Sequence, residues 1–171
     1  MNTRVINLFG GPGAGKSTCA SGLFYLMKKD GIRCEIANEW IKEKVYEENS
    51  YVLGDQMYVF AKQRKKLVQL MGKVEYIITD SPLLLSVIYG DKSGIFNSLV
   101  VEEFNKFVNL NFLIIRDHQY QMHGRMQDEG QAQDISQMIA SILNYKQIEY
   151  KDISSRNSAE EIYKCVKGEK R

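Results

Sequence analysis

Short apolar runs alternate with longer amphipathic stretches along this chain. The apolar runs have the length and composition of buried strands and comprise Val5–Phe9, Cys34–Asn38, Tyr76–Thr79, Phe112–Ile115 and Glu149–Ile153. Helix-like spacing of apolar residues marks Gly15–Lys29, residues 52–70, Asn97–Phe107, Ile135–Asn144 and Ala159–Val166. Alternation of this kind predicts an α/β fold: a five-stranded parallel sheet with helices on both faces.

Length and composition favour a single domain over residues 1–171. The 171 residues are 44% hydrophobic, which suffices for one sizeable core, and neither a repeat nor a Pro-rich linker interrupts them. The formal net charge is only +2, so extended, sequence-independent nucleic-acid binding is not expected. We expect residues 167–171 to form a frayed tail.

Cysteine usage and hydropathy indicate a cytoplasmic protein. Cys19, Cys34 and Cys165 are widely spaced and odd in number, as expected of reduced thiols. No run approaches the length of a membrane span, and the chain enters its first strand almost at once, without a signal-peptide pattern. We therefore expect no membrane association.

A glycine-rich loop follows the first strand and opens the first helix. It matches the pattern G-x-x-x-x-G-K-[ST] with Gly10, Gly11, Pro12, Gly13, Ala14, Gly15, Lys16, Ser17 and Thr18. Glycines allow backbone N–H groups to surround phosphate oxygens, the lysine reaches the β- and γ-phosphates, and the positive end of the helix faces the same anion. The motif predicts a nucleoside triphosphate site, most simply for ATP.

An acidic residue, Asp80, ends the third apolar strand. At the carboxyl edge of a parallel sheet it can support Mg²⁺ together with Ser17, or it can cap the short helix that follows; both roles are compatible. The next residue is Ser81, where many water-activating ATPases have a second acid, and no Asn-Lys-x-Asp guanine reader occurs. Both absences favour phosphoryl transfer to an acceptor over hydrolysis.

A second acid, Glu39, ends the second strand beside the only tryptophan, Trp40. A carboxylate there would face the γ-phosphate from the acceptor side and could orient or deprotonate an acceptor hydroxyl. The indole offers a flat wall for stacking a ring. Alternatively, Glu39 starts a charged helix over residues 41–48 and Trp40 is a core residue.

Two arginines surround a polar stretch after the fourth strand. Arg116 and Arg125 carry the planar donors that a lid over phosphates needs, and Gly124 could act as a pivot. We expect the lid to cover about residues 116–134, against the alternative of a solvated loop. His118 and His123 are interpreted as surface residues.

The helix predicted over residues 52–70 places polar and aromatic groups on one face. Gln56, Val59, Phe60 and Gln63 recur at helical spacing, and their amides and ring suit a heterocyclic base. The basic residues Lys62, Arg64, Lys65 and Lys66 form either a solvated face or a contact with an acceptor phosphate or DNA backbone.

Taken together, these motifs resemble small P-loop kinases of tailed bacteriophages, a group similar to deoxynucleoside and nucleotide kinases. The resemblance covers Arg4 to Ile153 and includes relatives that phosphorylate 5-hydroxymethyluracil already in DNA. Deoxynucleoside kinases usually have Glu-Arg-Ser after the third strand and Glu-Pro after the second. Here the corresponding residues are Asp80-Ser81-Pro82 and Glu39-Trp40.

The resemblance implies a P-loop NTPase fold of the nucleotide-kinase type that uses Mg·ATP. Catalysis would involve Lys16, Glu39, Asp80, Arg116 and Arg125, and the acceptor would contact Glu39, Trp40, Gln56, Phe60 and Gln63. The preferred acceptor is 5-hydroxymethyluracil in phage DNA, in the cytoplasm of an infected bacterium, and a free deoxynucleoside or its monophosphate is the alternative. A regulatory ATPase that binds a protein partner is the hypothesis from another class, and a homodimer is left open.

Overall fold

The computed structural model describes residues 2–38, 55–90, 94–121 and 127–168. Its centre is a parallel sheet of five strands in the order β2-β3-β1-β4-β5. The strands are β1 (Arg4–Phe9), β2 (Cys34–Ala37), β3 (Tyr76–Thr79), β4 (Val108–Ile115) and β5 (Lys151–Ser154). The predicted five-stranded parallel sheet is confirmed.

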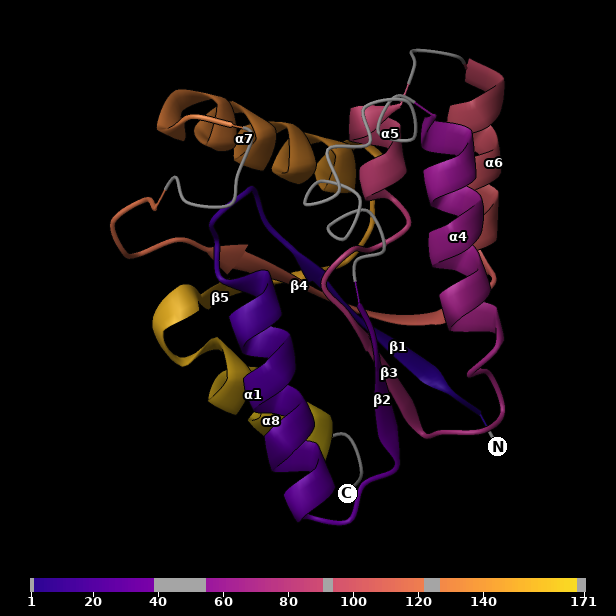
Figure 1. Cartoon of the computed structure of the whole chain (residues 1–171), viewed down its shortest axis with the longest axis vertical. Helices are drawn as coiled ribbons and strands as arrows, with labels where there is room; N and C mark the ends of the chain where they lie inside the picture. The colour runs from indigo at the N-terminus through magenta and orange to yellow at the C-terminus, as the bar shows by residue number, and fades with distance from the viewer. Residues whose placement is uncertain (1, 39–54, 91–93, 122–126, 169–171) are drawn as a thin grey trace.

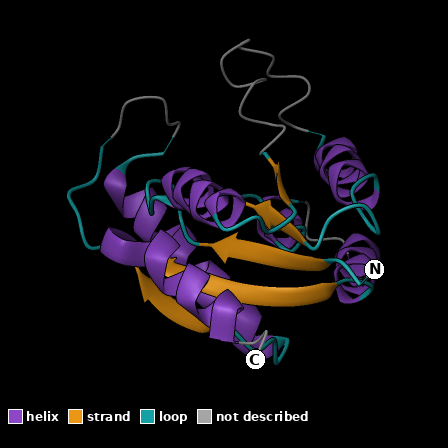
Figure 2. Ribbon diagram, turned by 90° about the horizontal axis from the view of Figure 1, so that it is seen from below, coloured by secondary structure: helices purple, strands orange, loops and turns teal. Residues whose placement is uncertain are grey.

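Helices cover both faces of the sheet (Figures 1 and 2). One layer consists of α1 (Lys16–Lys29) and α8 (Ser158–Gly168), which pack on each other. The other layer consists of α4 (Gln56–Val68), α5 (Leu85–Tyr89), α6 (Gly94–Asn105) and α7 (Glu129–Tyr145). A 3₁₀ turn, η1 (Ser155–Asn157), joins β5 to α8.

The central strand β1 explains why two layers form. Its side chains alternate, so that Ile6 and Leu8 join the core under α1 and α8 while Val5 and Phe9 join the core under the other helices. All four are essentially inaccessible to solvent. A strand that is apolar on both faces needs cover on both, which is the arrangement that parallel sheets adopt.

Strand β4 begins earlier than predicted, at Val108. Two asparagines there interrupt the apolar pattern, but their side chains are paired inside the sheet. The buried Asn7 on β1 donates from Nδ2 to the Oδ1 atoms of Asn109 at 2.8 Å and Asn111 at 2.9 Å. Satisfied polar groups can be buried, so the strand includes residues 108–111, to which the sequence pattern assigned no element.

Two helices also extend beyond the apolar periodicity that predicted them. Helix α7 starts at Glu129, where the side chain of Asp128 accepts from the Gln131 N–H and the Gln131 side chain accepts from the Asp128 N–H. This capping box starts the helix before its first apolar residue. Helix α8 includes Lys167, which we predicted to lie in a frayed tail; instead it forms an ion pair with Asp30 at the end of α1.

The three cysteines are free thiols, in agreement with the prediction. Cys19 and Cys34 are buried, and burial raises the pKa of each to about 11. Among the described helices, none combines the length and apolar character needed to cross a bilayer.

Candidate functional site

The glycine-rich loop joins β1 to α1 at the carboxyl edge of the sheet (Figure 1). Gly10, Gly13 and Gly15 have φ values of +145°, +76° and +90°, a region that side-chain-bearing residues rarely adopt. Gly15 is also the N-cap of α1. The loop therefore has its glycines where the backbone turns around the start of the helix, as the motif predicted.

Gly11 is required for a different reason, since helix α7 passes directly against it. A Cβ on Gly11 would lie 2.2 Å from Ser136 Oγ and 2.6 Å from the backbone oxygen of Ala132. The Ser136 hydroxyl is itself bonded to the Ala132 carbonyl at 2.8 Å. Helix α7 thus closes one side of the loop.

The side chain of Lys16 folds over the loop. Its ammonium donates to the carbonyl oxygens of Gly10 at 2.8 Å and Gly11 at 3.0 Å. The single cation of the motif is therefore held at the loop itself, where phosphate oxygens would lie if the loop binds a nucleotide.

Ser17 and Asp80 meet across the gap between α1 and β3. Ser17 Oγ donates to Asp80 Oδ2 at 2.6 Å, and Asp80 is only 5% exposed. Two adjacent oxygen donors fit Mg²⁺, which is usually bound by one or two protein oxygens together with substrate phosphates and water. The described residues contain no cluster of three or more His, Cys, Asp or Glu side chains that could hold a metal without such a substrate.

Helix α4 places its predicted acceptor-side residues toward the protein interior. Phe60 is 4% exposed and packs edge-on against Phe96, with ring centroids 5.8 Å apart. Gln63 is also 4% exposed, and its Nε2 lies 3.3 Å from the Ala37 carbonyl and 3.2 Å from Thr79 Oγ1. Gln56, the first residue of the helix, is half-buried. The shared face is confirmed; substrate contact by these residues stays a prediction.

Three of the four basic residues of α4 have partners within the described part of the chain. Arg64 Nε lies 2.5 Å from Glu103 Oε2 on α6, and Lys66 Nζ donates to the Asn38 carbonyl at 2.9 Å. Lys62 lies over the ring of Tyr58. Much of this charge is therefore engaged by neighbouring elements.

Arg116 contacts the start of α7. Its Nη2 lies 3.0 Å from Glu129 Oε1, and its guanidinium lies over the ring of Tyr120, whose hydroxyl donates to the Gln127 carbonyl. The other terminal nitrogen, Nη1, is buried with no hydrogen-bond partner in the described part of the chain. Residues 129–134, which we predicted to belong to the lid, are the first turns of α7.

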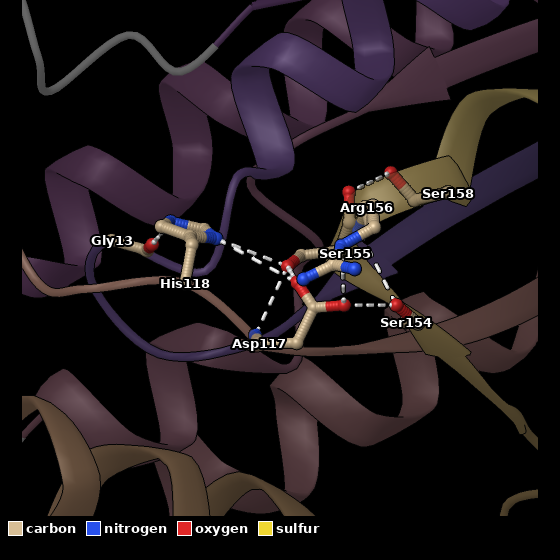
Figure 3. A network of polar contacts seen from close by, with 7 residues as sticks. All are labelled: Gly13, Asp117, His118, Ser154, Ser155, Arg156 and Ser158. Atoms are coloured by element: carbon tan, nitrogen blue, oxygen red, sulfur yellow. Dashed lines mark hydrogen bonds and ion pairs between the residues drawn. The ribbon is translucent and has the colours of Figure 1, made fainter.

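A polar network beside the loop was not predicted (Figure 3). His118, interpreted from the sequence as a surface residue, is exposed, yet its Nε2 lies 3.1 Å from the Gly13 carbonyl and its Nδ1 lies 3.0 Å from Ser155 Oγ. Both carboxylate oxygens of Asp117 accept hydroxyl hydrogen bonds, one from Ser154 and one from Ser155. These bonds, with the nearby Arg156 guanidinium, lower the pKa of Asp117.

One signal in the sequence could have indicated this network. Residues 116–118 follow β4, and residues 154–156 lie at and directly after the end of β5. Parallel strands bring their carboxyl ends to one edge of the sheet. The glycine-rich loop follows β1 at the same edge.

Three predicted site residues, Glu39, Trp40 and Arg125, lie outside the described residues, as does Gly124. Their roles remain those that the sequence predicts. Of the predicted site, the structure thus brings together the loop, Ser17 and Asp80, and places Arg116 beside α7.

Comparison with known proteins agrees with this geometry. A family model described as an AAA domain matches residues 5–161. The chain belongs to this AAA domain family. None of the curated proteins matches the sequence. Among solved structures, thymidylate kinase from Ehrlichia chaffeensis matches with a TM-score of 0.63 and 15% identity, over 98% of this chain and 100% of that one. The fold is therefore a P-loop NTPase fold of the type seen in that kinase.

Proposed function

We propose that this AAA domain protein is an ATP-dependent kinase that transfers the γ-phosphate to a hydroxyl of a pyrimidine deoxynucleotide. The observation that carries the proposal is the Ser17–Asp80 contact of 2.6 Å at the start of α1, beside a loop whose lysine is already turned onto its carbonyls. The fold shared with a thymidylate kinase supports the same class of reaction.

On the nucleotide side, the loop N–H groups and the α1 N-terminus would bind the phosphates, and Lys16 would offset charge on the transferring group. Ser17 and Asp80 would hold Mg²⁺, which supplies further neutralisation of phosphate charge when bound. Arg116 would approach the phosphates by exchanging Glu129 for phosphate oxygens, and Arg125 would act from the same lid. Such catalysis consists of positioning and electrostatics, without a protein nucleophile.

On the acceptor side, Glu39 would orient or deprotonate the hydroxyl, and Trp40 would stack on the base. Gln56 at the first turn of α4 would contact the base edge. Phe60 and Gln63 would support that contact indirectly, because both lie on the buried face of α4. The alternative roles of Glu39 and Trp40, in a helix start and the core, remain in competition with this proposal.

The preferred acceptor is the hydroxymethyl group of 5-hydroxymethyluracil within phage DNA, which would place the protein in the cytoplasm of an infected bacterium. Resemblance to phage kinases supports this choice. A free deoxynucleoside or its monophosphate is the alternative, favoured by the partnered state of Arg64 and Lys66, which leaves less charge for a DNA backbone.

Transfer of labelled γ-phosphate from ATP to a panel of acceptors tests the proposal. The panel contains deoxynucleosides, their monophosphates, unmodified DNA and DNA with 5-hydroxymethyluracil. The Lys16→Ala variant serves as the negative control. Label on the modified DNA alone establishes a DNA-base kinase, and label on a free nucleoside or monophosphate establishes a nucleotide-supply kinase. Phosphate release without a labelled acceptor would reject both in favour of an ATPase switch that acts on a protein partner.

A further inference from the structure

A single peptide group of the glycine-rich loop is held from both sides. The peptide between Gly13 and Ala14 offers its carbonyl to His118 Nε2 at 3.1 Å and its N–H to the Gly11 carbonyl at 3.2 Å. Rotation of this peptide would break both bonds. Because Gly13 has φ +76° and no side chain to restrict it, these two hydrogen bonds are what fix the orientation of the peptide.

The hydrogen bonds around Ser155 determine which atoms of the network carry a hydrogen. A serine hydroxyl has one hydrogen to donate and can accept two bonds. Ser155 Oγ donates to an Asp117 carboxylate oxygen and accepts from the Asp117 N–H at 3.1 Å. Its remaining capacity is for one more donor, and the atom that faces it is His118 Nδ1 at 3.0 Å. Nδ1 must then carry a hydrogen.

The other ring nitrogen faces an acceptor as well. Nε2 lies against the Gly13 carbonyl, which can only accept, so it too must carry a hydrogen for that bond to form. A neutral imidazole has one N–H and can satisfy only one of these two acceptors while the Ser155 hydroxyl serves Asp117. Every contact is satisfied at once only by the imidazolium.

The charges around the ring are compatible with this form. Asp117, an anion with a lowered pKa, has a carboxylate oxygen 3.9 Å from Nδ1. On the η1 side, Arg156 Nε lies 3.9 Å from the other Asp117 oxygen and offsets part of its charge. On the loop side, the Lys16 ammonium is turned to the Gly10 and Gly11 carbonyls. Arg116, on the same segment as His118, is paired with Glu129.

We infer that His118 is a positioning residue that, as an imidazolium, holds the Gly13 carbonyl and pre-orders the glycine-rich loop for nucleotide. The inference deepens the proposed function and rests on it for the identity of the ligand. Pre-ordering a loop lowers the entropy that binding must otherwise overcome. Histidine changes its charge between pH 5 and 8, so the ordering of the loop should depend on pH within that range.

ATP affinity of the full chain, measured by calorimetry at pH 6 and pH 8, tests the inference. The readout is the ratio of the variant's Kd to that of the wild type, in which the titration of ATP itself cancels. For His118→Ala we expect about a tenfold ratio at pH 6 and about threefold or less at pH 8, because hydrogen bonds to charged groups are the stronger ones. His118→Gln retains a neutral donor, so its own affinity should lack the histidine-dependent change with pH. A His118→Ala ratio near one at pH 6, or equal ratios at the two pH values, would overturn the inference.

Ring ¹⁵N NMR of His118 provides a readout that does not depend on ATP. The wild type should show both ring nitrogens protonated at pH 6, with the signal assigned by its loss in His118→Gln. Asp117→Asn removes the facing anion and should lower the population of the doubly protonated ring at pH 6; an unchanged population would count against the network. If the wild type binds no ATP at all, the proposed function fails, while these spectra still decide which ring nitrogens of His118 are protonated. Melting temperatures near that of the wild type confirm that the variants are folded, as expected for an exposed side chain.

Discussion

The proposed nucleotide side and the proposed acceptor side of this protein differ in which atoms would carry the chemistry. On the nucleotide side, the proposed contacts come largely from the backbone of a contiguous loop, with Lys16, Ser17 and Asp80 converging on it. On the acceptor side, the candidates within the described residues are side chains of one helix face, and two of them, Phe60 and Gln63, are buried. The spacing of the motif therefore predicts which residues lie together around the loop, whereas the residues of one helix face can serve either the core or a ligand.

The largest expected effect comes from the nucleotide side. Lys16→Ala should reduce phosphoryl transfer at least about a thousandfold, because it removes the cation that would offset transition-state charge. Rates with saturating ATP and the acceptor found in the panel measure this loss. Lys28→Ala is the matched control: it removes another lysine of α1 that is half-exposed and paired with Glu35, and should leave the rate unchanged. Substantial activity in Lys16→Ala would show that the loop does not work as proposed.

The acceptor side is tested by Glu39→Gln. If Glu39 orients or deprotonates the acceptor hydroxyl, turnover should fall by about a hundredfold or more while ATP affinity changes little. Steady-state rates combined with calorimetric ATP binding separate the two quantities. Near-normal turnover would remove Glu39 from the mechanism and leave it as the start of a helix.

The packing of α7 on the loop is tested by Gly11→Ala. The added Cβ would meet backbone of α7 at 2.6 Å, so the helix must shift, at a cost of about 1–3 kcal/mol. In a chain of 171 residues this should lower the melting temperature by roughly 3–10 °C. Gly94→Ala, with nothing within 4 Å of the new methyl group, is the control and should melt close to the wild type. Equal melting of both variants would mean that α7 does not close this side of the loop.

The smallest difference separates two glutamines of the same helix. Gln63→Leu removes the amide that contacts Ala37 and Thr79, and should destabilise the fold by about 1–3 kcal/mol because a buried acceptor loses its partner. Gln56→Ala, at the half-buried first turn, should leave stability within about 0.5 kcal/mol and instead raise the KM for the acceptor. Thermal melts and acceptor kinetics of the two variants measure both effects. The reverse assignment of effects would place Gln63, and not Gln56, at the base.

Most of the fold could be predicted, and the misses have two different causes. The central strands β1 and β3 were predictable because strands buried on both faces are apolar nearly throughout, whereas β5 has a single buried residue, Ile153. The early start of β4 was missed because Asn109 and Asn111 are polar, and their hydrogen-bond partner, Asn7, lies on another strand. The start of α7 was missed because a capping box, not apolar periodicity, begins that helix.

The sequence by itself determined the glycine-rich loop, the acid at the end of β3 and the order of elements, because these depend on neighbouring residues and on local periodicity. Tertiary structure alone decided what stands beside the loop. His118, Ser155 and the α7 residues that exclude a side chain at Gly11 lie more than 100 residues from it in the chain. They meet there because parallel strands bring the segments after β1, β4 and β5 to one edge. No local sequence pattern predicts these contacts, because the order of the strands in the sheet determines which segments meet.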